Sequence, residues 1–126
     1  MGNRAGRRYD LESRTLEFAK ELRRFVQSLP RTVGNVEDAK QVIRASGSIG
    51  ANYIEANEAL GKKDSLMRIR ISRKEAKETA YWLQLLDVRD NDTMEHQRQT
   101  LITEAGELLA IFGAILRKCE KPLPAP

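Results

Sequence analysis

The chain has 126 residues, of which 40% are hydrophobic and 32% charged, and it carries a formal net charge of +4 at pH 7. This length suits one domain with a single core, and the hydrophobic content is too high for a disordered chain. No stretch approaches the roughly 20 apolar residues that span a bilayer, and residues 1–10 lack the apolar middle of a signal peptide, so we expect a cytoplasmic protein without membrane contact.

The first predicted helix runs from about Leu11 to Leu29, where apolar residues recur at i, i+3, i+4 and i+7. Asp10 is its expected N-cap, and Pro30 ends it because the residue before a proline is driven out of the helical region. Residues 1–9 are expected to form a flexible basic arm that contains Arg4, Arg7 and Arg8.

The second predicted helix runs from residue 36 to about residue 60, with Asn35 as its N-cap and Gly61 as its C-cap. It contains Gly47 and Gly50, although a glycine inside a helix costs roughly 1 kcal/mol relative to alanine. One interpretation is a backbone surface left open for a ligand. We favour close helix packing, with the glycines of the fourth predicted helix as partners, Gly106 and Gly113.

Two further helices complete the predicted fold. The third runs from about residue 64 to residue 88. Asp92 and Glu95 resemble a capping box at the start of the fourth, which continues to about Lys118. Short connections favour antiparallel neighbours. We therefore predict an all-α, antiparallel up-down four-helix bundle over residues 10–119, followed by a Pro-rich tail over residues 120–126.

The third predicted helix carries more apolar residues than one core face requires. The face expected to enter the core holds Ile69, Ala76, Ala80 and Leu83. A second apolar set lies off that face and consists of Ile71, Tyr81, Trp82 and Leu85. Exposed aromatic clusters are typical of protein interfaces, so we expect self-association through the second set. The alternative is that these side chains only flank the core.

Positive charge is concentrated on the same helix. Residues 62–78 hold seven Lys or Arg residues and three Asp or Glu residues, a net charge of +4. At about 100° per residue, four of the cations project to one side, opposite the core face: Lys63, Arg70, Lys74 and Lys77. Together with Arg73 they form a candidate site for a nucleic-acid backbone. The alternative is an ordinary solvated face, on which Lys74 pairs with Glu78.

The sequence offers few groups for catalysis. The single histidine, His96, and the single cysteine, Cys119, lie roughly 35 Å apart on one predicted helix, at a rise of about 1.5 Å per residue. The Glu-x-x-Glu pairs of the chain lack the two Glu-x-x-His partners of a carboxylate-bridged metal bundle. We therefore expect no enzymatic activity, no metal ion and no cofactor.

Two runs of sequence resemble a known protein family. Residues 44–56 read RASGSIGANYIEA, and residues 73–83 read RKEAKETAYWL. Together they resemble the bacterial four-helix bundle proteins of which some are encoded by intervening sequences inside 23S ribosomal RNA genes. The resemblance spans about residues 10–119. The first run contains four polar residues to which the resemblance assigns no chemical role: Arg44, Ser48, Asn52 and Glu55.

The resemblance implies a ribosome-associated protein without established activity, assembled into a ring-shaped homo-oligomer with five subunits as the expected number. The family is distantly related to more basic pentameric accessory proteins of reverse transcriptases in diversity-generating retroelements. We therefore expect a non-enzymatic binding protein associated with structured, ribosomal RNA. The alternatives are an oligomeric protein-interaction scaffold or an accessory protein of another partner.

Overall fold

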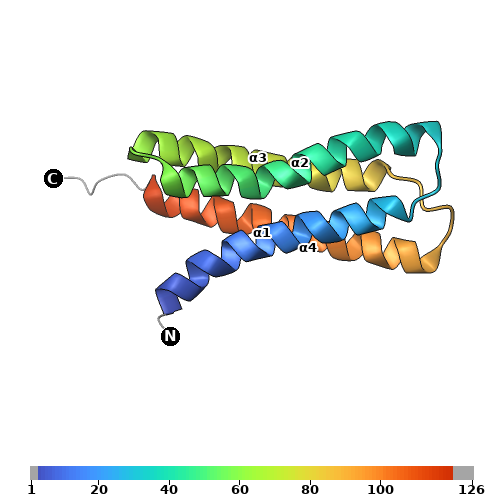
Figure 1. Cartoon of the computed structure of the whole chain (residues 1–126), viewed down its shortest axis with the longest axis horizontal. Helices are drawn as coiled ribbons and strands as arrows, with labels where there is room; N and C mark the ends of the chain where they lie inside the picture. The colour runs from blue at the N-terminus through green and yellow to red at the C-terminus, as the bar shows by residue number, and fades with distance from the viewer. Residues whose placement is uncertain (1–2, 121–126) are drawn as a thin grey trace.

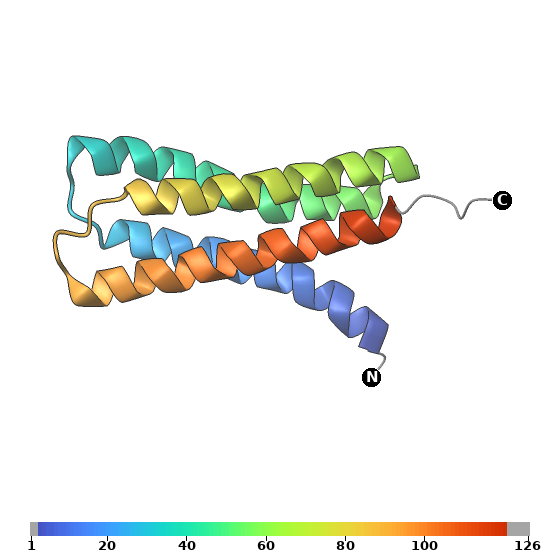
Figure 2. The ribbon, with the colours of Figure 1, turned by 180° about the vertical axis from the view of Figure 1, so that it is seen from behind.

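The computed structural model describes residues 3–120, with side chains described for residues 11–120. This part of the chain is all helical, has no strand, and contains four helices: α1 (Asn3–Gln27), α2 (Val33–Glu58), α3 (Lys62–Leu85) and α4 (Asp92–Cys119). The helices lie side by side along one long axis, and the chain reverses at each connection (Figures 1 and 2). Each helix contacts the next, and α1 also contacts α4, which closes the bundle.

The first helix is longer than the sequence pattern predicts. It begins at Asn3, so the expected N-cap at Asp10 is wrong. The first turns of α1 diverge from the other three helices (Figure 2). The division into a flexible arm, a bundle and a tail stays a prediction, because the side chains of residues 1–10 and the whole of residues 121–126 lie outside the described part.

One hydrophobic core runs between the helices, and each helix contributes a face to it. Leu22 of α1, Ile49 of α2, Leu83 of α3 and Phe112 of α4 are fully buried. Burying one such side chain stabilises the folded state by roughly 1.5–3 kcal/mol. The helices are therefore held together mainly by apolar burial, as their sequence periodicity predicts.

The fourth helix is also apolar enough to cross a membrane by length and composition. It has 28 residues and an 18-residue window with a mean hydropathy of 1.3, whereas we expected no such segment. In the structure, the apolar face of α4 packs inside the bundle, where Leu101, Leu108 and Phe112 are buried. The core helix of a soluble protein meets the same two criteria.

The N-cap of α2 differs from the predicted one. Thr32 caps this helix, and its hydroxyl oxygen accepts a hydrogen bond from the Asn35 backbone N–H at 3.0 Å. The Asn35 side chain is used elsewhere: Nδ2 donates to the carbonyl oxygens of Pro30 at 3.0 Å and of Asp87 at 2.9 Å. Its Oδ1 accepts from the Asp87 backbone N–H at 2.8 Å. The Asn35 side chain thus bonds to other parts of the fold and does not cap α2, which is the role that the local sequence predicts.

The predicted capping box of α4 is also wrong. Asn91 is the N-cap, and its Oδ1 accepts a hydrogen bond from the Met94 backbone N–H at 2.9 Å. Asp92 is therefore the first residue of the helix. The carboxylate of Glu95 accepts hydrogen bonds from the Arg98 guanidinium instead of bonding back to the cap.

Gly47 and Gly50 of α2 pack against α1 and not against α4. A methyl group on Gly50 would lie 2.7 Å from Thr15 Oγ1, so the two helices approach too closely for an alanine without movement. Close packing is thus confirmed for Gly50, while the predicted partners on the fourth helix are wrong. Gly61 serves as the N-cap of α3, and Ala59 is the C-cap of α2.

Candidate nucleic-acid interface

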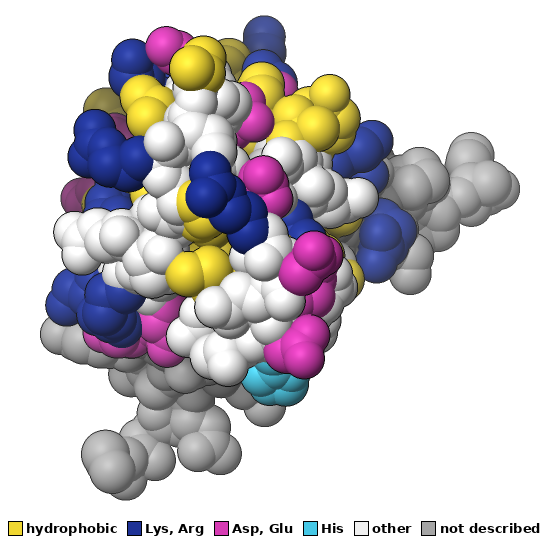
Figure 3. All heavy atoms as spheres, turned by 90° about the vertical axis from the view of Figure 1, so that its right-hand side faces the viewer, with side chains coloured by type: hydrophobic (Ala, Val, Ile, Leu, Met, Phe, Trp, Pro, Cys, Tyr) yellow, Lys and Arg dark blue, Asp and Glu magenta, His cyan; other side chains and the backbone are white. Residues whose placement is uncertain are grey.

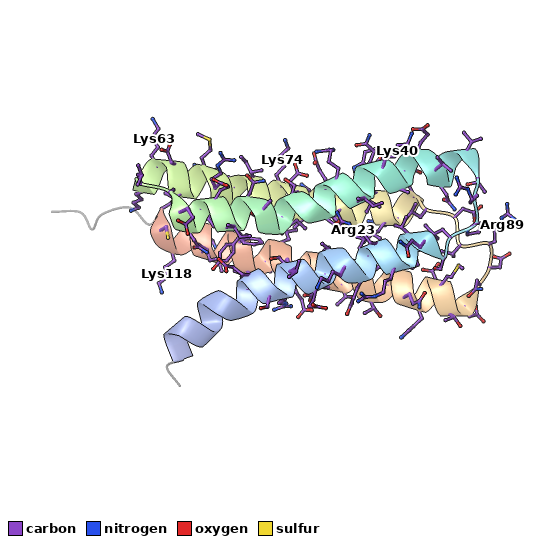
Figure 4. The ribbon with its side chains drawn as sticks, in the orientation of Figure 1. Arg23, Lys40, Lys63, Lys74, Arg89 and Lys118 are labelled. Atoms are coloured by element: carbon purple, nitrogen blue, oxygen red, sulfur yellow. The ribbon has the colours of Figure 1, made fainter. Side chains whose placement is uncertain are left out.

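The basic face of α3, defined as Lys63, Arg70, Lys74 and Lys77, is exposed along its whole length. Lys63 and Lys74 point away from the bundle on the same side (Figure 4). At the end of the molecule formed by the α1–α2 and α3–α4 connections, by contrast, acidic and basic side chains are interspersed (Figure 3). The residue spacing along α3 therefore places several cations on one side of that helix, whereas the connections at the other end show cations mixed with acidic side chains.

Three of the four cations on this face form no ion pair among the described residues. The ion pairs found in residues 11–120 include none with Lys63, Lys74 or Lys77, so the i,i+4 pair of Lys74 with Glu78 is not formed. Arg70 differs, because its guanidinium pairs with Glu120 just beyond the end of α4. The three lysines of the basic face are thus outside ion pairs, although Lys74 interacts electrostatically with Glu75.

Arg73 lies beside this face, on the side of α3 that meets α4. A methyl group built on Gly113 of α4 would lie 3.9 Å from Arg73 Nε and 3.3 Å from Arg117 Nη1. Two guanidinium groups from different helices therefore approach the same point. Arg117 is absent from the predicted site, and only its i+4 spacing from Gly113 on α4 could have indicated it.

The predicted interface residues fall into two pairs. Tyr81 is 58% exposed and Leu85 is 48% exposed, while Ile71 and Trp82 are half-buried, with Trp82 packed against the core. The rings of Tyr81 and Trp82 meet edge to face, with centroids 5.3 Å apart. By their spacing from Lys77, Tyr81 and Leu85 continue the line of the basic face. Apolar and basic surfaces are thus adjacent on one side of α3.

Two of the four polar residues of the 44–56 run, Ser48 and Asn52, are hydrogen-bonded to each other on α2. Asn52 Nδ2 donates to both the carbonyl oxygen and the hydroxyl oxygen of Ser48 at 2.9 Å. Its Oδ1 accepts from Arg68 of α3 at 3.0 Å, which links the two helices. Arg44 and Glu55 are exposed at either side of this pair. Asn52 therefore has a structural role, the pairing of α2 with α3.

A buried carboxylate of α3 interacts electrostatically with Arg44, one of these four residues. Glu75 of α3 is 6% exposed, and its Oε2 has no hydrogen-bond partner among the described residues. Burial raises the pKa of Glu75, the neighbouring Glu78 raises it further, and Arg44 and Lys74 lower it. Loss of hydration thus favours the neutral form of this carboxyl group.

Groups that could hold a metal ion are not gathered in the described residues. No three His, Cys, Asp or Glu side chains in that part of the chain are arranged as ligands. His96 lies in the second turn of α4, whereas Cys119 is the last residue of that helix. The expected absence of a metal ion, a cofactor and an enzymatic activity stays a prediction.

The chain is similar to known proteins over most of its length. A family model described as 23S rRNA-intervening sequence protein matches residues 7–113. A crystal structure from Bacteroides thetaiotaomicron, of a protein with unknown function from the S23 ribosomal protein family, is 31% identical with a TM-score of 0.70; the match covers 84% of this chain and 97% of that chain. No curated protein matches. The chain belongs to the family of 23S rRNA-intervening sequence proteins.

Proposed function

We propose that this protein is a non-enzymatic, cytoplasmic binding protein that associates with structured ribosomal RNA through the basic face of α3. The observation that carries the proposal is the row of exposed lysines that form no ion pair, Lys63, Lys74 and Lys77. These residues span about 20 Å of helix at about 1.5 Å per residue. Such a row can neutralise several phosphates of an RNA backbone and release their counterions.

The same side of α3 lacks the set of exposed aromatic side chains on which single-stranded bases stack. Tyr81 is its one exposed aromatic side chain, and the Tyr81 ring already contacts Trp82. Proteins that read unpaired bases stack them on aromatic side chains. The proposed contact is therefore with the phosphates and the shape of a folded RNA, and not with its base sequence.

The second part of the proposal is assembly. Antiparallel bundles would associate into a homo-oligomeric ring, with five subunits as the expected number, through Tyr81 and Leu85 and the half-buried Ile71 and Trp82 beside them. Large apolar side chains exposed together are typical of interfaces. A ring would present several copies of the basic face to one RNA and raise its affinity through multivalency. Native mass spectrometry tests the stoichiometry, and a monomer at micromolar concentration would contradict it.

A protein-interaction scaffold is the second candidate function, and the exposed apolar side chains of α3 favour it. Met67 is 50% exposed on the same side of the helix as Tyr81 and Leu85. A scaffold predicts that partner proteins are recovered after nuclease treatment. Recovery of partners only while RNA is intact favours the RNA proposal instead.

The RNA proposal is tested by charge reversal. The first triple variant is Lys63→Glu, Lys74→Glu, Lys77→Glu. The control has an equal charge change and is Arg24→Glu, Arg31→Glu, Arg89→Glu. Its three positions are exposed on α1, in the α1–α2 connection and in the α3–α4 connection. With fragments of 23S ribosomal RNA at about 100 mM salt, the first variant should lose affinity by more than tenfold and the control by far less. Equal losses, or none, would refute the proposed placement, provided that circular dichroism shows both variants folded.

A further inference from the structure

Gly113 of α4 is a buried glycine that the backbone does not require. Its φ is negative, as are the φ values of the other described glycines, so no left-handed conformation calls for it. Glycine is a poor helix former, because it gains no side-chain contacts and loses much backbone entropy. A methyl group at this position would meet only two side chains within 4 Å, namely Arg117 and Arg73. The absent methyl group therefore leaves room for the Arg117 guanidinium, at 3.3 Å, while Arg73 Nε, at 3.9 Å, lies at ordinary contact distance from the same point.

The two arginines reach this point from different helices. Arg117 lies one turn after Gly113 on α4, and Arg73 comes from α3. Neither forms an ion pair with any carboxylate in the part of the chain whose side chains are described. Glu120 lies nearby, but it pairs with Arg70. The two positive groups are thus adjacent without an anion to compensate their repulsion.

We propose that Arg73 and Arg117, positioned over Gly113, bind one phosphate group of an RNA backbone. Guanidinium groups donate paired N–H bonds that match phosphate oxygens, and two of them can enclose one phosphate from two sides. Arg73 precedes Lys74 of the basic face, so the phosphate path would extend from α3 onto α4. This inference rests on the proposed RNA binding and assigns one specific site within it.

One measurement examines the site independently of RNA. Inorganic phosphate is titrated into the protein while NMR follows the Arg73 and Arg117 Nε–H resonances. Both resonances should shift together and saturate in the wild-type protein, and the shifts should be much smaller in Gly113→Ala, whose methyl group displaces Arg117 Nη1. Shifts that do not saturate in the wild-type protein, or that are unchanged in Gly113→Ala, would overturn the inference.

Measurements of RNA affinity then distinguish the contribution of this site from that of the basic face of α3. The double variant Arg73→Gln, Arg117→Gln should bind a 23S ribosomal RNA fragment roughly tenfold more weakly, with a salt slope smaller by about one. Gly113→Ala should also bind more weakly while its melting temperature does not fall. If the double variant Lys74→Gln, Lys77→Gln binds RNA more weakly and the double variant Arg73→Gln, Arg117→Gln does not, the inference fails and the proposed function stands. If the wild-type protein binds no RNA, the proposed function fails and the inference fails with it.

Discussion

Asn35 and Asp87 are 52 residues apart in the sequence and exchange two hydrogen bonds at one end of the bundle. The Asp87 backbone N–H donates to Asn35 Oδ1 at 2.8 Å, and Asn35 Nδ2 donates to the Asp87 carbonyl oxygen at 2.9 Å. A third bond from Asn35 Nδ2 reaches the Pro30 carbonyl oxygen. One buried amide therefore ties the α1–α2 connection to the segment that follows α3.

The first prediction concerns this amide. Asn35→Ala should lower the free energy of unfolding by about 3 kcal/mol, because it removes three hydrogen bonds that the buried Asn35 side chain forms with backbone groups of Pro30 and Asp87. Gln41→Ala, at an exposed position on the same helix, is the control and should change stability by less than about 0.5 kcal/mol. Urea unfolding followed by circular dichroism measures both. A loss below about 1 kcal/mol for Asn35→Ala would contradict the assigned role.

The second prediction compares two glycines inside helices. Gly50→Ala should destabilise the fold by about 1–3 kcal/mol, because its methyl group would lie 2.7 Å from Thr15 Oγ1 and push α1 away from α2. Gly106→Ala should instead stabilise the fold by about 1 kcal/mol, since nothing lies within 4 Å of the added methyl group. Thermal unfolding of both variants checks the signs, and the same sign for both would be inconsistent with the packing described.

The sequence predicted the existence and approximate span of all four helices, because each carries one apolar face that the core requires. The third helix, expected over about residues 64–88, spans Lys62–Leu85. The caps were less predictable. Asn35 and Asn91 are both good capping residues by type, but only the tertiary fold determines that Asn35 bonds to Asp87 while Asn91 caps α4.

The candidate site was predicted in part for a related reason. The periodicity of a single helix places Lys63, Lys74 and Lys77 on one side of α3, and these residues are exposed there. The approach of Arg73 to Arg117 depends on how α3 and α4 are rotated about their axes relative to each other. The pairing of Arg70 with Glu120 depends on the same rotation. No pattern within one helix contains that information.

The third prediction is a pH dependence that originates at Glu75. Because burial raises its pKa in the folded state, Glu75 contributes stability that is fully present below the ordinary value of 4.5 and is lost as the pH rises through the raised pKa. The stability of Glu75→Gln relative to the wild-type protein should therefore increase from pH 4 to pH 7. Chemical unfolding at several pH values measures the difference. A relative stability that stays constant or decreases over this range would exclude a raised pKa.

The fourth prediction concerns the half-buried pair of Glu95 and Arg98. Hydrogen bonds from Arg98 and then from Gln99 lower the pKa of Glu95 to about 2. This carboxylate therefore contributes stability above its ordinary pKa of 4.5, and the contribution is lost as the pH falls toward 2. NMR titration of the Glu95 side chain should give a pKa well below its ordinary value of 4.5. Removing the charged donor in Arg98→Gln should raise the Glu95 pKa toward its ordinary value, with the bond from Gln99 left in place, and an unchanged pKa would contradict the assigned cause.

The place where RNA contacts the protein is the central point of the proposed function. Ultraviolet cross-linking of the wild-type protein to 23S ribosomal RNA, followed by mass spectrometry of the cross-linked peptides, locates that contact directly. We predict that the cross-links fall on α3 between Lys63 and Tyr81 and on α4 near Arg117, and that they diminish as salt is raised. Cross-links confined to α1 or to the connections between helices, or no cross-links at low salt, would contradict the proposed function.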